Sequence, residues 1–567
     1  MRMNTFNTIR ATAATSLPDR LRLLADRRLG AGNFLDKVRA VAKHPDEPFL
    51  WLPGTVRGKS QIERLSLEDL IRIRNAHAAW YHAAGVGKGD PVGVYLGDGI
   101  APLLQFLALS SLGAIPALIN ERMPPEIAAE YLGRVGAVGL TSDRAGLEAV
   151  RAAGGTARLR FTVDTSELPA LTERTGPLPA AFPYQHADED LVMLCHTSGT
   201  TGAPKAATFA HKQFFIGKRS RLVKFPPARR NRMLSALPQT HSAGISYLMT
   251  AILLGMPTYV MNDTSGKAVR EAMAFFRPTI VTGFPQTYSE LATLEPDTKG
   301  SSEVHTWINT GDSAHEAHIR PLIQQGRRPG LWGSRPGSRF IDGLGSSEMG
   351  MALFRKVSEP ETVNYGRCVG KPVEVVTRAA VFDDEGRELG PGNPGRLGVH
   401  TPTVTPGYWN NTGQTTRSSL YGYWLTGDVV YRDAQGRFYH LDRVPDVIHT
   451  ATGPVYSLPV EEAILANVPI VQDCAVVAVT DPDSPEHSVP FASVRLDPAK
   501  PEPEDPKALI NAALSQNGLA TVNGVVVART AADFPTGATG KVLKRALRER
   551  FANALTDANL PTENSTR

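Results

Sequence analysis

Cysteine is scarce in this chain: only Cys195, Cys368 and Cys474 occur among 567 residues, and they stand far apart. Their spacing excludes a disulfide framework and a cysteine-based metal site, so we expect a reducing, cytoplasmic compartment. An excess of one charge is also missing, because 61 basic residues face 56 acidic ones. The net charge of +5 and the lack of a dense basic tract exclude a nucleic-acid partner.

Long apolar runs are rare as well. Residues 99–120 carry no charge and are long enough to cross a bilayer. Prolines and polar residues interrupt the stretch, so a buried helix over 102–112 and a strand over 114–119 explain it better. The first residues lack the apolar run of a signal peptide. We therefore expect no transmembrane segment, and we treat 1–44 as an N-terminal arm.

What the sequence does contain is an alternation of short apolar strands and helical patterns up to Glu348. A helix over 67–84, for example, follows the capping residue Ser66 and precedes a strand over 91–96. This alternation favours a mostly parallel sheet with crossover helices. From about Val373 the pattern becomes β-like, with turns rich in glycine and proline, and a smaller unit follows Asp446.

The fold class is therefore predicted as α/β, and 567 residues are too many for one hydrophobic core. We expect a large N-terminal domain of α/β sheets with a β-rich subdomain, and a small, mobile α+β C-terminal domain. The predicted parts are an arm over 1–44, the large domain over 45–441, a hinge over 442–446 and the small domain over 447–567.

A loop suited to binding an anion is the first candidate site. An apolar strand over 191–194 leads into residues 195–207, which gather hydroxyls and glycines ahead of Lys205. Glycines let backbone N–H groups approach an anion, and the lysine adds a positive charge. The spacing from Gly199 to Lys205 is not that of a Walker A motif. We predict a loop that holds a polyphosphate, although composition alone also allows a solvated turn.

Further candidate side chains follow later strands and loops. Glu348 ends a predicted strand and suits a Mg²⁺ ligand. Asp428 can accept from two adjacent ribose hydroxyls, and Arg443 lies close enough in sequence to reach the same nucleotide. His241 stands on a loop containing glycine, and Lys541 on a glycine-rich loop near the C-terminus. Each residue alone is explained better by a surface charge or a structural histidine, but their combination in this order is not.

Taken together, these motifs resemble the adenylate-forming superfamily of acyl-CoA synthetases, peptide-synthetase adenylation domains and luciferases, over about residues 45–550. Residues 204–207 and 241–244 look most like the fatty-acid transport protein and very-long-chain acyl-CoA synthetase branch. The resemblance implies two steps. A carboxylate first attacks the α-phosphate of ATP, which gives an acyl-adenylate and pyrophosphate; a thiol, usually of CoA, then displaces AMP. It thus implies ATP, Mg²⁺, a small-molecule acid and CoA.

The resemblance also implies roles for individual residues. Lys541 would bridge the carboxylate and the α-phosphate, with Lys205, Glu348 and His241 as further catalytic residues. Glu348 and Thr200 would bind the metal. The acid pocket is assigned to His241, Gly283, Phe284 and Thr287. The nucleotide is assigned to Thr197, Ser198, Gly199, Thr200, Thr201, Gly202, Gly311, Asp312, Ser313, Leu344, Gly345, Ser347, Asp428 and Arg443.

Three positions depart from the family pattern. Leu344 replaces the aromatic residue that packs on adenine, and Arg396 stands where glutamate is usual. Pro445 occupies the hinge, where backbone dihedral angles are expected to change as the small domain rotates. Proline fixes its own φ and restricts the residue before it. We therefore expect adenylation to be retained and thioester formation to be altered.

Three functions consequently stay open at this point. The default is an acyl- or aryl-CoA ligase. The alternative is a specialised ligase with an acceptor other than CoA, such as the relatives that use ATP and nitrite to make diazo groups on aryl amines. The third, a non-catalytic nucleotide-binding protein, does not explain why Lys541, Glu348 and Asp428 occur together. The sequence predicts nothing about oligomeric state.

Overall fold

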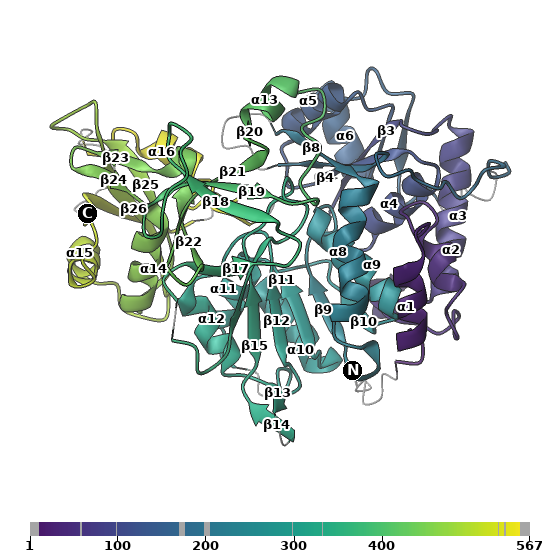
Figure 1. Cartoon of the computed structure of the whole chain (residues 1–567), viewed down its shortest axis with the longest axis horizontal. Coiled ribbons are helices and arrows are strands. Elements are labelled where there is room, and N and C mark those ends of the chain that lie inside the picture. The colour runs from purple at the N-terminus through teal and green to yellow at the C-terminus, as the bar shows by residue number, and fades with distance from the viewer. Residues whose placement is uncertain are drawn as a thin grey trace.

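The computed structural model describes residues 11–56, 59–97, 99–168, 176–197, 204–296, 299–330, 333–363, 365–530, 532–537 and 540–555. Within them, two large sheets with helices packed on them form the body of the molecule, and a smaller unit lies at the C-terminal side (Figure 1). This confirms the predicted α/β fold. No helix formed by these residues is both long and apolar enough to cross a bilayer.

The first sheet is parallel apart from its last pair of strands. Its order is β6 (Phe161–Asp164), β5 (Gly139–Ser142), β3 (Pro91–Leu96), β4 (Ile115–Asn120), β7 (Leu191–His196) and β8 (Ala206–Ala210). The helices that connect its strands or precede them are α3 (Leu67–Ala83), α4 (Ala101–Ser111), α5 (Pro125–Val135) and α6 (Arg144–Ala152). A capping box between Ser66 and Asp69 begins α3, as the sequence predicts. The β3 and β4 strands are buried along their whole length, as expected of a parallel sheet covered on both faces.

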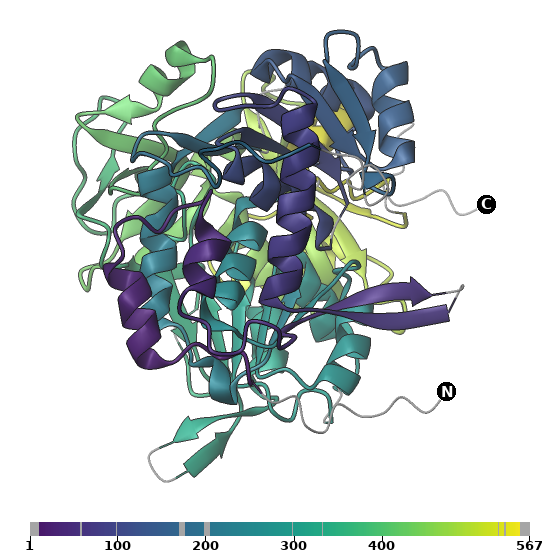
Figure 2. The same ribbon diagram turned by 90° about the vertical axis from the view of Figure 1, so that its right-hand side faces the viewer.

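The second sheet combines a parallel part with an antiparallel part. The parallel strands are β1 (Leu50–Val56), β10 (Thr258–Val260), β9 (Met233–Ala236), β11 (Ile280–Gly283), β12 (Thr306–Asn309) and β15 (Arg339–Asp342), and β2 (Lys59–Leu65) pairs antiparallel with β1. The β1–β2 hairpin projects from the body, as the purple hairpin in Figure 2 shows. The associated helices are α8 (His211–Lys224), α9 (Ser242–Leu254), α10 (Gly266–Phe276), α11 (Pro285–Thr293) and α12 (Glu316–Ile323).

The antiparallel part corresponds to the predicted β-rich region. Its strands are β16 (Phe354–Ser358), β17 (Cys368–Pro372), β22 (Phe438–Arg443), β21 (Tyr423–Arg432), β19 (Gly395–His400) and β18 (Arg378–Phe382), with β20 (Ser419–Leu420) beside β21. Peripheral elements are the hairpin β13 (Arg327–Gly330) and β14 (Gly333–Pro336), the short helix α13 (Thr412–Arg417) and the 3₁₀ turn η1 (Ala228–Arg230). This part of the sheet brings Asp428 and Arg443 into register on adjacent strands.

The C-terminal unit follows the 3₁₀ turn η2 (Val444–Asp446). It contains β23 (Ile448–Thr450), β24 (Gly453–Val455), α14 (Ser457–Asn467), β25 (Val471–Thr480), β26 (Ser488–Leu496), α15 (Pro506–Gln516), β27 (Gly524–Val527) and α16 (Lys544–Phe551). Its helices pack on a sheet of order β25-β26-β27 around a separate apolar core. A core of its own is what allows such a unit to behave as a domain.

The described part of the N-terminal arm folds onto the large domain. It forms α1 (Leu17–Ala25) and α2 (Phe34–Arg39), which the sequence did not predict. Leu23, Phe34 and Leu35 are fully buried in the same core as α8 and α9. Arg219 of α8 also donates to the backbone oxygens of Leu24 and Leu29, at 3.0 and 3.2 Å. The N-terminal arm thus packs against α8 and supports it.

Candidate active site

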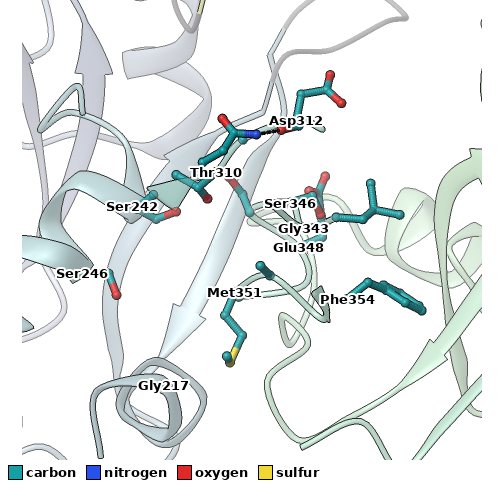
Figure 3. Close-up of a pocket in the computed structure, with 18 of the residues that line it drawn as sticks. Gly217, Ser242, Ser246, Thr310, Asp312, Gly343, Ser346, Glu348, Met351 and Phe354 are labelled. Carbon is teal, nitrogen blue, oxygen red and sulfur yellow. Dashed lines mark hydrogen bonds between the residues drawn. The ribbon is translucent and has the colours of Figure 1, made fainter. Parts of the chain in front are cut away.

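A cavity of about 590 Å³ lies at the carboxyl ends of β11, β12 and β15. This is where ligands gather in open α/β sheets, because loops and unpaired backbone groups meet there. Figure 3 shows part of its lining, including Asp312, Glu348 and Phe354. The predicted residues that line it are Thr197, Lys205, His241, Phe284, Gly311, Asp312, Leu344, Gly345, Ser347, Glu348, Asp428, Arg443, Pro445 and Lys541.

The anion-binding loop connects β7 to β8. Its base is closed by a hydrogen bond of 2.9 Å from the N–H of Thr197 to the backbone oxygen of Lys205. Its predicted central residues, Ser198, Gly199, Thr200, Thr201 and Gly202, lie outside the described residues. The metal role assigned to Thr200 therefore stays a prediction.

A cluster of three side chains follows the loop into the cavity. The Tyr408 hydroxyl donates to Oε1 of Glu348 at 2.9 Å, and Nζ of Lys205 lies 5.2 Å from the centroid of the Tyr408 ring. Burial lowers the pKa of Lys205, although the charge of Glu348 opposes this shift. The tyrosine therefore orients Glu348 and leaves its Oε2 atom available to a cation, while Lys205 offers a positive charge to an anion.

Asp428, the carboxylate predicted to bind the ribose, is buried. The Asp428 side chain is 6% exposed, and its Oδ1 lies 3.1 Å from Nε of Arg443 and 3.6 Å from Nε2 of His440. Burial alone would raise the pKa of Asp428, but Arg443 and His440 outweigh it and the pKa lies below its ordinary value. Asp428 is therefore ionised at neutral pH, and a carboxylate held on one side can accept from two ribose hydroxyls.

The small domain contributes the side chain of Lys541 to this cavity. Nζ of Lys541 lies 3.3 Å from Oδ2 of Asp312. Asn309 positions the Asp312 loop, because its amide donates to the Asp312 backbone oxygen at 2.6 Å (dashed line in Figure 3). Burial would raise the pKa of Asp312, but Lys541 and then His440 hold it far below its ordinary value. The lysine is thus paired but still partly open to solvent, with 30% of its side chain exposed.

His241 stands at the N-terminus of α9 as a neutral side chain. Its Nδ1 accepts the N–H of Ala243 at 3.1 Å, and the ring meets Phe284 edge-on with centroids 5.2 Å apart. Burial lowers the pKa of His241 to about 3, and His196 and Lys541 add to the shift. Because Nδ1 accepts a hydrogen bond, the ring proton is on Nε2. The histidine therefore offers a neutral donor.

Comparisons with known proteins identify the family. A family model described as AMP-binding enzyme matches residues 38–409. The chain belongs to the AMP-binding enzyme family. It is 38% identical over 562 residues to the 3-aminoavenalumate diazotase of a Streptomyces species, covering 95% of this chain and 98% of that protein. It is 28% identical over 497 residues to the feruloyl-CoA synthase of an Amycolatopsis species, covering 86% and 94%.

A solved structure agrees with this assignment at the level of fold. The anthranilate CoA ligase AuaEII, in complex with anthranoyl-AMP, matches with a TM-score of 0.80 at 21% identity, over 93% of this chain and 98% of that one. The AMP-binding enzyme described here is an adenylate-forming ligase, which confirms the class of reaction predicted from the sequence.

Three predicted site residues of the AMP-binding enzyme do not line the cavity. Gly283 ends β11 and pairs with Asn309 inside the sheet. The Thr287 hydroxyl is buried and donates to the backbone oxygen of Thr264 at 2.8 Å. The Ser313 hydroxyl accepts from Nη2 of Arg367 at 2.7 Å. Sequence proximity to lining residues explains these assignments, because Phe284 and Asp312 do face the cavity.

A second part of the cavity was missed by sequence reasoning. We call it the α8–α9 arm; it is lined by Gly217, Ser220, Arg221, Ser242, Ser246 and Met351. Ser242 and Ser246 lie one turn apart on α9 and face Gly217 and Met351 in Figure 3. Small and hydroxyl-bearing residues at helical spacing were the available signal. The α8 helix itself was not predicted, so the signal was not used.

The contact between the two domains centres on Glu462 of α14. Its carboxylate accepts from Nδ1 of His315 at 2.6 Å and from the N–H of Glu316 at 2.9 Å, at the N-terminus of α12. Burial would raise the pKa of Glu462, but the hydrogen bond from His315 helps to lower it to about 2. Nε2 of His318 also lies 3.1 Å from the backbone oxygen of Gln472. These contacts hold the orientation in which Lys541 reaches the cavity.

Proposed function

We propose that this enzyme uses ATP to activate nitrite and transfers the nitrosyl group to an aryl amine, so that a diazo compound forms. The observation that carries the proposal is the 38% identity to a diazotase along nearly the whole chain. The similarity to a CoA-dependent enzyme is lower, at 28%. A ligase with an acceptor other than CoA was the alternative that the sequence left open. It thereby becomes the preferred function.

The proposed reaction balances as two transfers and a dehydration. A nitrite oxygen attacks the α-phosphate, and the bond to pyrophosphate breaks. The amine nitrogen then attacks the nitrosyl nitrogen, AMP departs with the former nitrite oxygen, and the amine loses a proton. The resulting N-nitrosamine takes up one proton and loses water, which gives the diazonium group. Such transfers need positioning and charge neutralisation more than covalent help from the protein.

The residues of the cavity supply those two requirements. Lys541 is proposed to neutralise charge at the α-phosphate, and Lys205 to do so at the β and γ phosphates. Asp428 and Arg443 are proposed to hold the ribose, and Leu344, 4% exposed, to pack on the adenine. The neutral Nε2–H of His241 is suited to donate to nitrite or to a phosphate oxygen, because a neutral donor does not protonate the nucleophile.

The same cavity fits a magnesium ion. Glu348 is oriented by Tyr408, and its second carboxylate oxygen accepts no hydrogen bond from the residues that the structure describes. We propose that it holds Mg²⁺, which would supply positive charge to the phosphates of ATP.

The restrained hinge favours an acceptor that can react without a rotation of the small domain. Pro445 lies in η2, with Arg443 bound to Asp428 before it and Asp446 paired with Arg548 after it. Proline removes freedom at φ in a segment that is anchored on both sides. Nitrite and an aryl amine can both react in the closed cavity, whereas a CoA thiol requires its own access route.

The test is a reconstitution with ATP, magnesium, nitrite, an aryl amine and CoA, omitting one component at a time. We expect AMP release and diazo absorbance to depend on both nitrite and the amine, and to ignore CoA. AMP release that needs CoA and an acid, with no effect of nitrite, would overturn the proposal.

An aryl-acid CoA ligase is the second candidate, favoured by the similarity to feruloyl-CoA synthase. The finer assignments from the sequence also stay proposals: placement near the fatty-acid transport protein branch, a hinge over 442–446, a small-molecule acid substrate and a cytoplasmic location. The three cysteines support this location, because all three are buried and none forms a disulfide with another.

A further inference from the structure

The α8–α9 arm ends at a cation without a carboxylate partner. Arg221 forms no ion pair within the part of the chain that the structure describes. Its Nη1 donates to the backbone and hydroxyl oxygens of Ser246, at 3.2 and 2.9 Å, and to the Thr250 hydroxyl at 3.2 Å. Its guanidinium also lies 4.0 Å from the centroid of the Tyr247 ring. The guanidinium is thus held in place from one side by α9.

Neighbouring charges leave this end of the arm positive. Lys224 and Glu374 also line the cavity and pair with each other at 3.1 Å. Arg355 lines the same region, and its charge acts on Glu374. Lys218, behind Arg221 on α8, is buried over the Phe214 ring and does not line the cavity. The single acidic side chain at this end is therefore neutralised by Lys224, and Arg221 keeps its charge for a ligand.

Two hydroxyl groups of α9, those of Ser246 and Thr250, accept hydrogen bonds from the Arg221 guanidinium. Ser220 precedes Arg221 on α8, and Ser246 faces it from α9. Gly217 and Met351 line the α8–α9 arm between this end and the nucleotide part of the cavity. Because Gly217 has no side chain, they leave an apolar passage between them. Planar guanidinium groups flanked by hydroxyls are well suited to carboxylates, which accept two parallel hydrogen bonds.

We infer that Arg221 anchors a carboxylate at the end of the aromatic substrate that lies farthest from the α-phosphate. This rests on the proposed function and makes it more specific: the substrate is an amino-aryl carboxylate whose carboxyl group is a binding handle and is not adenylated. The amine then points toward His241 and Lys541, at the other end of the arm, where activated nitrite is formed.

The inference is tested by equilibrium binding of two matched probes to the full-length protein, without ATP, nitrite or CoA. The probes are 3-aminocinnamate and 3-aminocinnamamide, which differ only at the terminal group: a charged carboxylate in one and a neutral amide in the other. We expect the wild type to bind the carboxylate more tightly by about tenfold or more. Arg221→Gln should abolish that preference, and Arg221→Lys should retain part of it because the charge remains.

Lys212→Gln is the matched control, since Lys212 is exposed on the same helix and does not line the cavity. It should bind both probes as the wild type does. Equal binding of the two probes by the wild type, or equal weakening of both by Arg221→Gln, would overturn the inference. If Arg221→Gln does not fold, Arg221→Lys and the probe preference of the wild type decide.

The outcome is separable from that of the proposed function. A carboxylate preference that depends on Arg221, together with CoA-dependent AMP release, would leave this inference standing and remove the diazotase. Nitrite-dependent diazo formation with no carboxylate preference would support the diazotase and overturn the role of Arg221.

Discussion

At the scale of single residues, burial decides which side chains carry charge into the cavity. Lys541 is partly exposed, and its Nζ lies beside the carboxylate of Asp312. His241 is buried beside Phe284 and loses its charge. One site thus combines a charged group for the phosphate with a neutral donor, although both residues titrate as bases in water.

Replacing Lys541 by alanine should lower the rate of AMP formation by about 10²- to 10³-fold, because the charge is needed where negative charge develops. The folded structure should be kept, since the lysine is not buried. Steady-state AMP release measures the effect. Lys507→Ala, at an exposed position on α15 of the same domain, is the control and should behave as the wild type. Unchanged turnover of Lys541→Ala would remove the proposed role.

The burial of His241 predicts a dependence of stability on pH. Its pKa of about 3 lies below the ordinary 6.5, so the unfolded chain binds a proton that the folded chain refuses. Stability contributed by this site is full above pH 6.5 and falls as the pH drops toward 3. Between pH 7.5 and 5.5 the wild type should lose about 1.4 kcal/mol more than His241→Gln, measured by urea unfolding.

The same substitution keeps an N–H donor, so activity between pH 6 and 8 should show no inflection from residue 241 in either protein. An acid-induced loss of stability equal in both proteins would contradict the neutral state of His241.

At the scale of elements, the strands and the capped helices could be predicted, but α8 could not. The predicted helices over 67–84 and 102–112 correspond to α3 and α4, because the Ser66 cap and the uncharged apolar run are strong local signals. The α8 helix has no side-chain cap and carries basic residues on several faces, including the buried Lys218. It packs against α9 and against α1, which is distant in sequence, so packing decides its existence.

The passage between α8 and α9 gives a test of the arm. A Cβ on Gly217 would meet Sδ of Met351 at 3.7 Å, an ordinary contact, and the further methyl groups of valine would fill the passage. Gly217→Val should therefore raise KM for the aryl amine by about tenfold, the cost of crowding a packed space. KM for ATP should not change, because the nucleotide is proposed to bind in the other part of the cavity.

Gly133→Val serves as the control for that test. Gly133 lies on α5, and a Cβ there meets nothing within 4 Å. Equal effects of Gly217→Val on both substrates would show that the α8–α9 arm does not hold the amine.

At the scale of the whole molecule, the question is whether the small domain must rotate during the reaction. The contacts of Glu462 with α12 and of Lys541 with Asp312 stabilise the closed orientation. Pro445, in the proposed hinge, would restrict the change of φ that such a rotation would use. The two features agree with a reaction that is completed in one orientation.

Changing Pro445 to glycine should leave nitrite-dependent AMP release unchanged, because the proposed reaction does not use the hinge. A small loss of stability, about 0.4–1 kcal/mol, is expected from the added freedom of the unfolded chain. Enzyme assays and thermal unfolding measure the two effects. A fall in turnover well beyond this loss of stability, or the appearance of CoA-dependent AMP release, would show that the hinge controls the choice of acceptor.

The sequence by itself determined the class of fold and the class of reaction. Its motifs place hydroxyls, glycines and charged groups directly after short apolar strands, and strand ends in an α/β sheet necessarily meet at one edge. Only the tertiary structure decided what shares that edge with the nucleotide. Lys541 reaches Asp312 across 229 residues of chain because the small domain packs on α12. Arg221 faces the cavity because α9 holds its guanidinium. Contacts between segments so distant in sequence depend on packing, which no local pattern encodes.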